Sequence, residues 1–265
     1  MWKYDHSPLG FEVTEFDRAY FETHYRKKSW FGFDAGKRPF LYHFWLRKIR
    51  RLTGNADRIL EVGCGLGYLL QYLEKDRPVI GVDLSMDALR IARKSTRIPL
   101  LQASAVDLPF KEGCFSVAVA LDLIEHLPRP EMFLAETGRV LKKGGVFILS
   151  TPNPSSFGAT VKGRKAEIKG RPDNDGIPEW YGWRDSTHIS IQTISNWRNL
   201  LKSHGFRILK DGTDTFWDVP YFKGIPYALQ KAFFISLQWA LTWAFGFFPW
   251  TWGENYICIA RKVAP

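Results

Sequence analysis

A glycine-rich turn is the segment of this 265-residue sequence whose residue types and spacing point most directly to chemistry. The residues ILEVGCGLGYLL, 59–70, place three glycines between an apolar run and a helical pattern. Glycines there let the backbone approach a ligand without Cβ clashes, and the helix start offers N–H groups to an anion. A dinucleotide-binding fingerprint, G-x-G-x-x-G, would require glycine where Tyr68 stands. The turn therefore predicts a nucleotide-type ligand, with Glu61 as an acidic residue in the strand before it.

Short apolar runs alternate with helical patterns around this turn and predict an α/β fold with a parallel sheet. The expected strands are Arg58–Val62, Val79–Val82, Leu100–Gln102, Phe115–Leu121, Val146–Ser150, Phe206–Lys210 and Asn255–Arg261. The expected helices are 16–29, 37–52, 66–75, 85–95, 130–142 and 193–204. We expect the 130–142 helix to end in a cationic turn, Lys142-Lys143, capped by Gly144-Gly145.

Four segments, in order, resemble the motifs of class I S-adenosylmethionine-dependent methyltransferases. They are the glycine turn, VIGVDLS at 79–85, LDLIEHLP at 121–128 and RVLKKGGVFILSTPN at 139–153, and a weaker similarity runs through 185–206. The resemblance implies a doubly wound, seven-stranded, mostly parallel sheet with an antiparallel last strand. It also implies S-adenosylmethionine as the cofactor.

The resemblance further implies which residues contact the methionine and sulfonium parts of that cofactor. The glycine turn would pass under the methionine part, with Glu61 near its ammonium group. Leu121 and Asp122 would lie beside the sulfonium, at the end of the fourth strand. The residues implied for the turn itself are Gly63, Cys64, Gly65 and Gly67.

The nucleoside end of the cofactor is implied to lie beyond the second and third strands. Asp83 would accept the ribose hydroxyls, and Leu84 would lie against the adenine. An alternative is that Asp83 only serves the start of the next helix, for which Ser85 is the better cap. Ser104 and Ala105 stand where many members of the family carry an acidic residue that bonds the adenine amino group.

Two histidines are the candidates for catalysis. The fourth strand's end would face the methyl group, and imidazole titrates near neutral pH, so His126 is the first candidate for a general base. The alternative is that His126 only caps the turn before Pro128. His188, in DSTHIS, matches a histidine of related small-molecule methyltransferases and would line the acceptor site with the aromatic residues of 180–183. A buried structural histidine is the alternative there.

The same segment also offers candidate metal ligands. Asp122, Glu125 and His126 resemble the Glu-x-x-Glu-His arrangement by which some quinone-pathway O-methyltransferases bind a divalent cation, with Asp in place of the first Glu. Most relatives with Glu-His here are not known for a metal, so we expect none.

The net charge and the cysteines indicate which binding partners and which cellular compartment to expect. The net charge of +10 indicates an anionic partner, whether nucleic acid, an acidic membrane surface or an anionic substrate, although solvated helix faces explain it more simply. The three cysteines have no zinc-site spacing and suit a reducing compartment. The first residues lack the apolar run of a signal peptide, so we expect a cytoplasmic protein, with peripheral membrane contact left open.

The expected organisation is one core with additions on its substrate side. We assign 1–57 to an N-terminal helical lid, 58–151 to the cofactor-binding core, 152–192 to a substrate-side insertion and 193–265 to the completion of the core. The last part contains an aromatic helical insertion at 216–253, whose segment Ala232–Trp250 carries no charge. A single membrane crossing is excluded if the strands on either side pair in one sheet. A cap over the substrate pocket, a membrane-surface or re-entrant element and an oligomer interface remain open.

The leading functional hypothesis is in-line methyl transfer to a small, apolar, lipid-like or secondary-metabolite acceptor. An RNA methyltransferase is the alternative that the basic charge and aromatic residues favour. The chain lacks the Asn/Asp-Pro-Pro-Tyr/Phe tetrapeptide of many base-amino methyltransferases, which disfavours a nucleic acid partner. A non-catalytic cofactor-binding protein is the third class.

Overall fold

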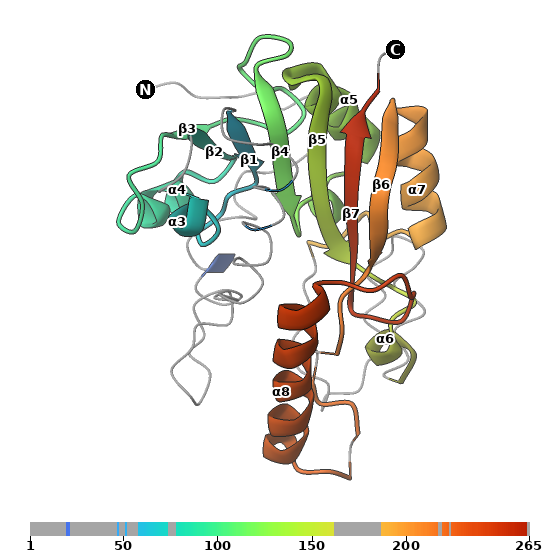
Figure 1. Ribbon diagram of the computed structural model, residues 1–265. Coiled ribbons are helices and arrows are strands. Elements are labelled where there is room, and N and C mark those ends of the chain that lie inside the picture. The colour runs from blue at the N-terminus through green and yellow to red at the C-terminus, as the bar shows by residue number, and fades with distance from the viewer. Residues whose placement is uncertain are drawn as a thin grey trace.

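One sheet of seven strands organises the chain, in the order β3-β2-β1-β4-β5-β7-β6 (Figure 1). The computed structural model describes residues 20–21, 47, 51, 58–73, 78–161, 187–216, 219–222 and 224–263. Neighbouring strands pair in parallel except β7, which is antiparallel to both β5 and β6. The expected fold class is therefore confirmed, including the antiparallel last strand.

The strands follow the predicted order along the chain. They are β1 (Ile59–Val62), β2 (Val79–Asp83), β3 (Leu100–Gln102), β4 (Phe115–Leu121), β5 (Leu141–Pro152), β6 (Phe206–Thr213) and β7 (Asn255–Lys262). The helices are α3 (Leu70–Leu73), α4 (Met86–Ala92), the 3-10 helix η2 (Ile124–His126), α5 (Pro130–Val140), α6 (Phe157–Val161), α7 (Ile194–Ser203) and α8 (Tyr227–Phe245).

Helices cover both faces of the sheet, because side chains along each buried strand alternate between two apolar cores. On one face, Ala118 and Phe147 share a cluster with Phe133 of α5 and Trp197 of α7. On the other face, strand residues such as Val117 and Ile148 share a cluster with α3 and with Leu89 of α4. Each fully buried Phe or Leu contributes about 1.5–3 kcal/mol, so these two cores fix the sheet and its carboxyl edge.

The carboxyl edge of the sheet collects the connections that matter for function. The glycine turn follows β1, η2 follows β4 and α6 follows β5 at that edge. Strand β6 also ends there, because it and β5 are both antiparallel to β7. The connection that contains α8 therefore leaves from the same edge, as Figure 1 shows.

Several helix boundaries differ from the prediction; α4, for example, ends at Ala92 instead of residue 95. The expected 130–142 helix ends at Val140, and Lys142–Gly145 belong to β5 instead of forming a capped turn. Leu141 is fully buried and pairs with Phe115, which favours an extended backbone over another helical turn. The expected 66–75 helix begins only at Leu70, because Gly67 has φ +74° and interrupts the helical backbone.

Parts of the predicted lid and insertion lie outside the described residues. Of the expected helices 16–29 and 37–52, only residues 20, 21, 47 and 51 are described, and all four are helical. Tyr20 and Phe21 are buried and cluster with Leu66 and Ala88, beside the glycine turn. The aromatic residues 180–183 fall in the undescribed segment 162–186.

The aromatic insertion at 216–253 contains one long helix, α8, of 19 residues. Strands β6 and β7 on either side of it pair antiparallel in the sheet, which is the condition that excludes a single membrane crossing between them. In the described part of the chain, no helix combines the length and hydropathy that a membrane span requires.

Candidate cofactor and acceptor site

The glycine turn needs glycine for both conformation and space. Gly63, Gly65 and Gly67 have φ of +70°, +50° and +74°, in the left-handed region that side chains disfavour. A Cβ at Gly63 would lie 2.8 Å from Leu123 Cδ1, and one at Gly67 would lie 3.0 Å from Ala92 Cβ. The backbone of this turn therefore approaches its neighbours more closely than any other residue type would permit.

Asp83 connects the glycine turn to the helix that follows β2. Gly65 N–H donates to Asp83 Oδ2 and Ser85 N–H donates to Asp83 Oδ1, both at 2.8 Å. Ser85 Oγ accepts from Ala88 N–H at 3.2 Å, so Ser85 caps α4, as predicted. Burial raises the pKa of Asp83, and the N–H donors of Ser85 and Gly65 oppose that rise. The N–H group of Leu84 also donates to this carboxylate, which has about four acceptor positions and so can still accept from a hydroxyl.

Glu61 places a carboxyl group in the buried part of β1. Its Oε2 has no hydrogen-bond partner within the described residues. Burial raises the pKa of Glu61 well above its ordinary value, and the nearby charge of Asp83 adds to the rise. A buried carboxylate without a partner is costly, so this position favours a cation or a hydrogen-bond donor from outside the protein. The same surroundings keep the Cys64 thiol protonated, since burial, and then Asp83 and Glu61, raise its pKa.

The residues predicted for the adenine lie just beyond two paired strands. Asp83 of β2 pairs with Gln102 of β3, and Leu84 and Ser104 follow these strand ends. Leu84 is 36% exposed, so its side chain has open surface for a flat ring. Ser104 Oγ accepts from Val106 N–H at 3.3 Å, and Ala105 is half-buried beside it.

Asp122 holds the end of β4 in a strained conformation. Its φ of +52° is left-handed, the one such value for a non-glycine residue in the described chain. Asp122 N–H donates to the Ser150 carbonyl oxygen at 3.0 Å, and Ser150 Oγ donates to Asp122 Oδ1 at 2.8 Å. Such strain persists where surrounding contacts fix it, and it gathers at functional sites. Leu121, half-buried, precedes it and pairs with Ser150.

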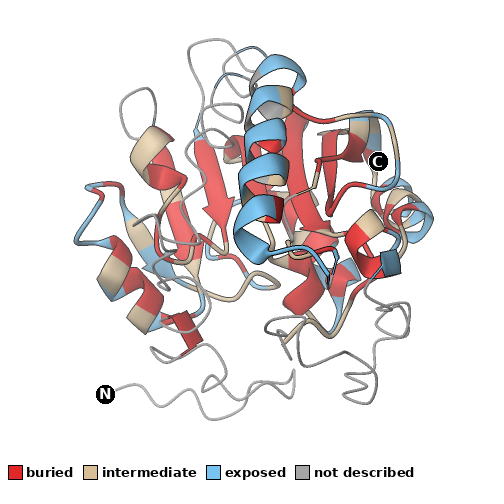
Figure 2. Ribbon diagram, turned by 90° about the horizontal axis from the view of Figure 1, so that it is seen from below, coloured by how far each residue is buried: buried red, intermediate tan, exposed pale blue. Residues whose placement is uncertain are grey.

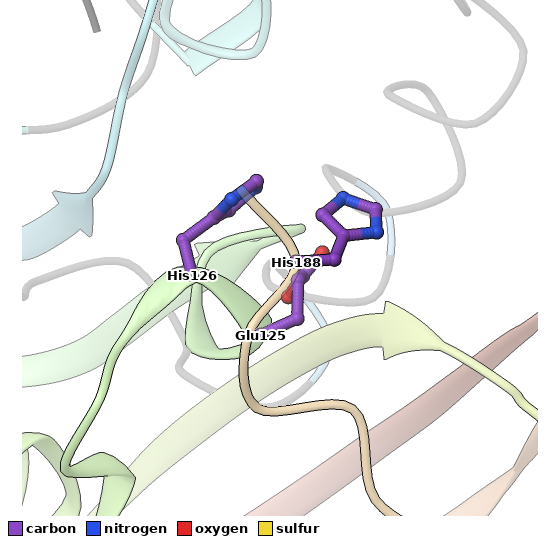
Figure 3. Close-up of side chains that lie close together, drawn as sticks. All are labelled: Glu125, His126 and His188. Carbon is purple, nitrogen blue, oxygen red and sulfur yellow. The ribbon is translucent and has the colours of Figure 1, made fainter. Parts of the chain in front are cut away.

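A cluster of one carboxyl group and two imidazoles lies next to this strand end (Figure 3). The rings of His126 and His188 meet edge to face, with centroids 4.8 Å apart. His126 Nδ1 lies 2.8 Å from Thr187 Oγ1 and 3.2 Å from the Thr187 carbonyl oxygen. The N–H groups of residues 189 and 190 donate to the Glu125 carbonyl oxygen at 2.9 and 2.8 Å, which docks this distant segment on η2.

The group that could hold a metal differs from the one considered in the sequence. Ligand atoms of Glu125, His126 and His188 all lie within 4.8 Å of one another, and Asp122 is not part of this group. Thr151 Oγ1 donates to Glu125 Oε2 at 3.1 Å. A carboxylate with two imidazoles suits a divalent transition metal, and it equally suits acid–base chemistry on an acceptor.

Comparison with known proteins decides the family. A sequence model described as a methyltransferase domain matches residues 37–211. A ubiquinone biosynthesis O-methyltransferase of Xanthomonas oryzae is 31% identical over 170 residues, 56% of this chain and 71% of that protein. The chain belongs to the class I S-adenosylmethionine-dependent methyltransferases.

Other relatives of this methyltransferase match over shorter stretches. A fatty-acid O-methyltransferase of Mycolicibacterium smegmatis is 36% identical over 105 residues, 37% of this chain and 38% of that protein. The chain spans about half the length of other curated relatives that it matches, 48% and 45% for two of them. A solved structure from Pyrococcus horikoshii has the same fold, with a TM-score of 0.59 at 18% identity over 96% of this chain and all of that one.

S-adenosylmethionine, the cofactor of this family, fits the residues of this methyltransferase. Its methionine ammonium group is a cation and a hydrogen-bond donor, and either would stabilise the buried Glu61 carboxyl group. The left-handed glycine turn leaves the backbone at Gly65 without a Cβ, and a Cβ built there would meet no atom nearer than 3.8 Å, so a ligand can approach this backbone closely. Two contacts escaped the sequence prediction, those of Thr187 with His126 and of Ser150 with Asp122. A hydroxyl residue next to a histidine or at a strand end gives no distinctive sequence signal.

Proposed function

We propose that this methyltransferase transfers the methyl group of S-adenosylmethionine to a small, apolar, lipid-like acceptor at the carboxyl edge of its sheet. The binding of the methyl donor is supported by the buried Glu61 carboxyl group next to the glycine turn, whose Oε2 has no hydrogen-bond partner among the described residues. The acceptor half is supported by the names of two relatives, which act in ubiquinone biosynthesis and on fatty acids.

The cofactor roles proposed for individual residues follow the geometry of the strand ends. Glu61 binds the ammonium group, and the backbone of 63–67 lies under the methionine part. Asp83 accepts the ribose hydroxyls through its remaining lone pairs while it stays bonded to Gly65 and Ser85. Leu84 covers the adenine, Ser104 and Ala105 border its amino group, and Leu121 and Asp122 lie beside the sulfonium.

S-adenosylmethionine supplies an activated methyl group, so the protein mainly aligns the acceptor with it. Where the acceptor is a hydroxyl or an acid, its proton must leave as the new bond to carbon forms. We assign this proton to His126. If His126 Nδ1–H donates to the Thr187 carbonyl oxygen, Nε2 becomes the nitrogen of the ring that accepts a proton. His188, in contact with the His126 ring, lines the same acceptor site.

Calorimetric titration with S-adenosylmethionine tests the donor half. Asp83→Ala should weaken binding about 100-fold, since it removes a charged acceptor of ribose hydrogen bonds. Asp87→Ala is the matched control, because Asp87 is an acidic residue on the next helix whose partner is the exposed Arg90. An Asp83→Ala affinity near that of the wild type would refute the ribose assignment.

The acceptor half is tested with methyl-labelled cofactor and two fractions of a cell extract, total lipid and total RNA. Label in the lipid fraction supports the proposal, and label in RNA overturns it in favour of an RNA methyltransferase. The three cysteines are all free, which supports the cytoplasmic location that we propose for this activity.

A further inference from the structure

Helix α8 buries two glutamines and exposes several large apolar side chains, an unusual combination for a surface helix. Gln230 and Gln238 are the most buried of its described side chains, 2% and 6% exposed. Leu229, Phe233 and Phe245 are 63%, 64% and 63% exposed. Figure 2 looks onto this helix from the carboxyl edge and shows it as a largely exposed rod across the front of the molecule.

The buried glutamine fixes the rotation of α8. Gln230 Nε2 donates to the carbonyl oxygens of Phe222 and Ile225, both at 2.7 Å. Its Oε1 accepts from the N–H groups of Tyr221 and Phe222 at 2.7 and 2.9 Å. Phe234, one turn later, packs on Tyr221 with ring centroids 4.8 Å apart. These contacts hold α8 in one rotation about its axis, in which Leu229 and Phe233 are exposed.

The exposed side of α8 carries no charge over most of its length. Between Ala232 and Trp250 the sequence contains no acidic or basic residue. Amphipathic aromatic side chains mark both ends, with Tyr227 52% exposed at the start and Trp252 50% exposed beyond the end. Tyr and Trp prefer the boundary between an apolar medium and water, so these side chains suit contact with a membrane interface.

We propose that the exposed face of α8, formed by Leu229, Phe233 and Leu237, docks on the surface of an anionic lipid bilayer. Charge complementarity favours this occupant, because the chain carries +10 and attracts an acidic surface. A second copy of the chain would instead bring two strongly positive molecules together.

The docking would explain how a lipid-like acceptor reaches the enzyme, and this role rests on the proposed function. The α8 connection and the glycine turn both leave the carboxyl edge of the sheet. A bilayer that contacts α8 therefore faces the edge where the methyl donor binds, and an apolar acceptor reaches that edge from the lipid without crossing water.

Vesicle co-sedimentation tests the docking without cofactor or acceptor. The full chain is mixed with vesicles of phosphatidylcholine alone and of phosphatidylcholine with phosphatidylglycerol. The test variant is Phe233→Glu with Leu237→Glu. The matched control is Leu209→Glu with Val263→Glu, two apolar residues of similar exposure to Leu237 on β6 and after β7. Circular dichroism and calorimetric affinity for S-adenosylmethionine verify that each variant is folded and binds the donor.

We expect the wild type and the control to sediment with the mixed vesicles, and the α8 variant to bind at least tenfold more weakly. Weaker binding of the wild type to vesicles of phosphatidylcholine alone than to the mixed vesicles would show that the anionic lipid contributes to binding. A wild-type dimer in light scattering that the α8 variant dissociates, without vesicle binding, overturns the proposal in favour of a second copy. Equal vesicle binding by the α8 variant and the control also overturns it. Normal cofactor affinity in either case leaves the proposed function standing.

Discussion

The buried carboxyl group of Glu61 makes cofactor binding depend on pH. Its raised pKa means that it is protonated in the free protein at pH values where an ordinary glutamate is ionised. The ammonium of S-adenosylmethionine binds the ionised form. Affinity should therefore fall as the pH is lowered through this pKa, and calorimetry over a pH series measures it. Glu61→Gln should bind more weakly at neutral pH and show a flat profile. A wild-type profile equally flat would contradict the ammonium role.

The same residue predicts a gain of stability on mutation. Because the folded-state pKa of Glu61 lies above its unfolded value, the folded chain holds a proton that the unfolded chain releases. Stability is then greatest below the ordinary pKa and declines as the pH rises through the raised one. Glu61→Gln removes this decline and should raise the melting temperature at neutral pH by roughly 2–8 °C, for about 1–2 kcal/mol. The exposed Glu131→Gln serves as control and should change it little.

The two histidines should affect turnover more than donor binding. His126→Ala is expected to lower the rate of methyl transfer into the lipid fraction about 100-fold or more, with little change in affinity for S-adenosylmethionine. His204→Ala, at the end of α7, is the control. Added chelator should leave the wild-type rate intact. Loss of activity with chelator and recovery with a divalent ion would instead make the cluster with Glu125 a metal site.

Single residues show which parts of the site the sequence can reveal. The glycine turn, Asp83 and the Ser85 cap are encoded locally, within a strand, a turn and the first helical residues, so their types and spacing sufficed. The packing of His188 on His126 joins residues 62 positions apart, and they are brought together by the docking of residues 189 and 190 on the Glu125 carbonyl and by the contact of Thr187 with His126. The strained Asp122 likewise depends on Ser150 of a neighbouring strand.

At the scale of elements, alanine substitutions at two glycines with similar φ angles distinguish the cost of backbone strain from the cost of steric crowding. Gly67 and Gly144 have φ of +74° and +78°, but a Cβ would meet Ala92 at 3.0 Å only in the first case. Gly144→Ala should lower the free energy of unfolding by roughly 1–2 kcal/mol, because a residue with a Cβ is strained in the left-handed backbone conformation. Gly67→Ala should cost roughly 2–4 kcal/mol and also weaken cofactor binding. Urea unfolding and calorimetry measure both. Equal losses of stability in the two variants would show that contact with α4 adds no steric cost at Gly67.

The presence and order of the strands were predicted more reliably than the ends of strands or helices, because burial on both faces gives strands an unbroken apolar signal. Strand β5 spans Leu141–Pro152, whereas the expected strand was Val146–Ser150. The 130–142 helix was extended two residues too far, since Lys142 and Gly144 are typical of a helix end as well as of an irregular strand start. Burial of Leu141 and its pairing with Phe115 decide between these conformations, and both depend on tertiary contacts.

At the scale of the whole molecule, the helix at the carboxyl edge should matter for delivery of the acceptor and not for binding of the donor. Some contacts join the residues on either side of α8 without the helix, since Asn255 N–H donates to Asp214 Oδ1 at 2.7 Å and Tyr221 OH donates to Glu254 Oε1 at 2.6 Å. Replacing Tyr227–Phe245 with a Gly/Ser linker of equal length should therefore leave the sheet folded.

We expect this replacement to preserve calorimetric affinity for S-adenosylmethionine, because the glycine turn and Asp83 lie on β1 and β2, at the other side of the sheet order from β6 and β7. Methyl transfer into lipid presented as anionic vesicles should fall at least tenfold, whereas transfer into the same lipid dispersed in detergent should fall less, because detergent delivers the acceptor without docking. Equal loss in both forms would show that α8 contributes directly to the acceptor site, as a cap does. Retained transfer in both forms would remove α8 from the catalytic cycle altogether.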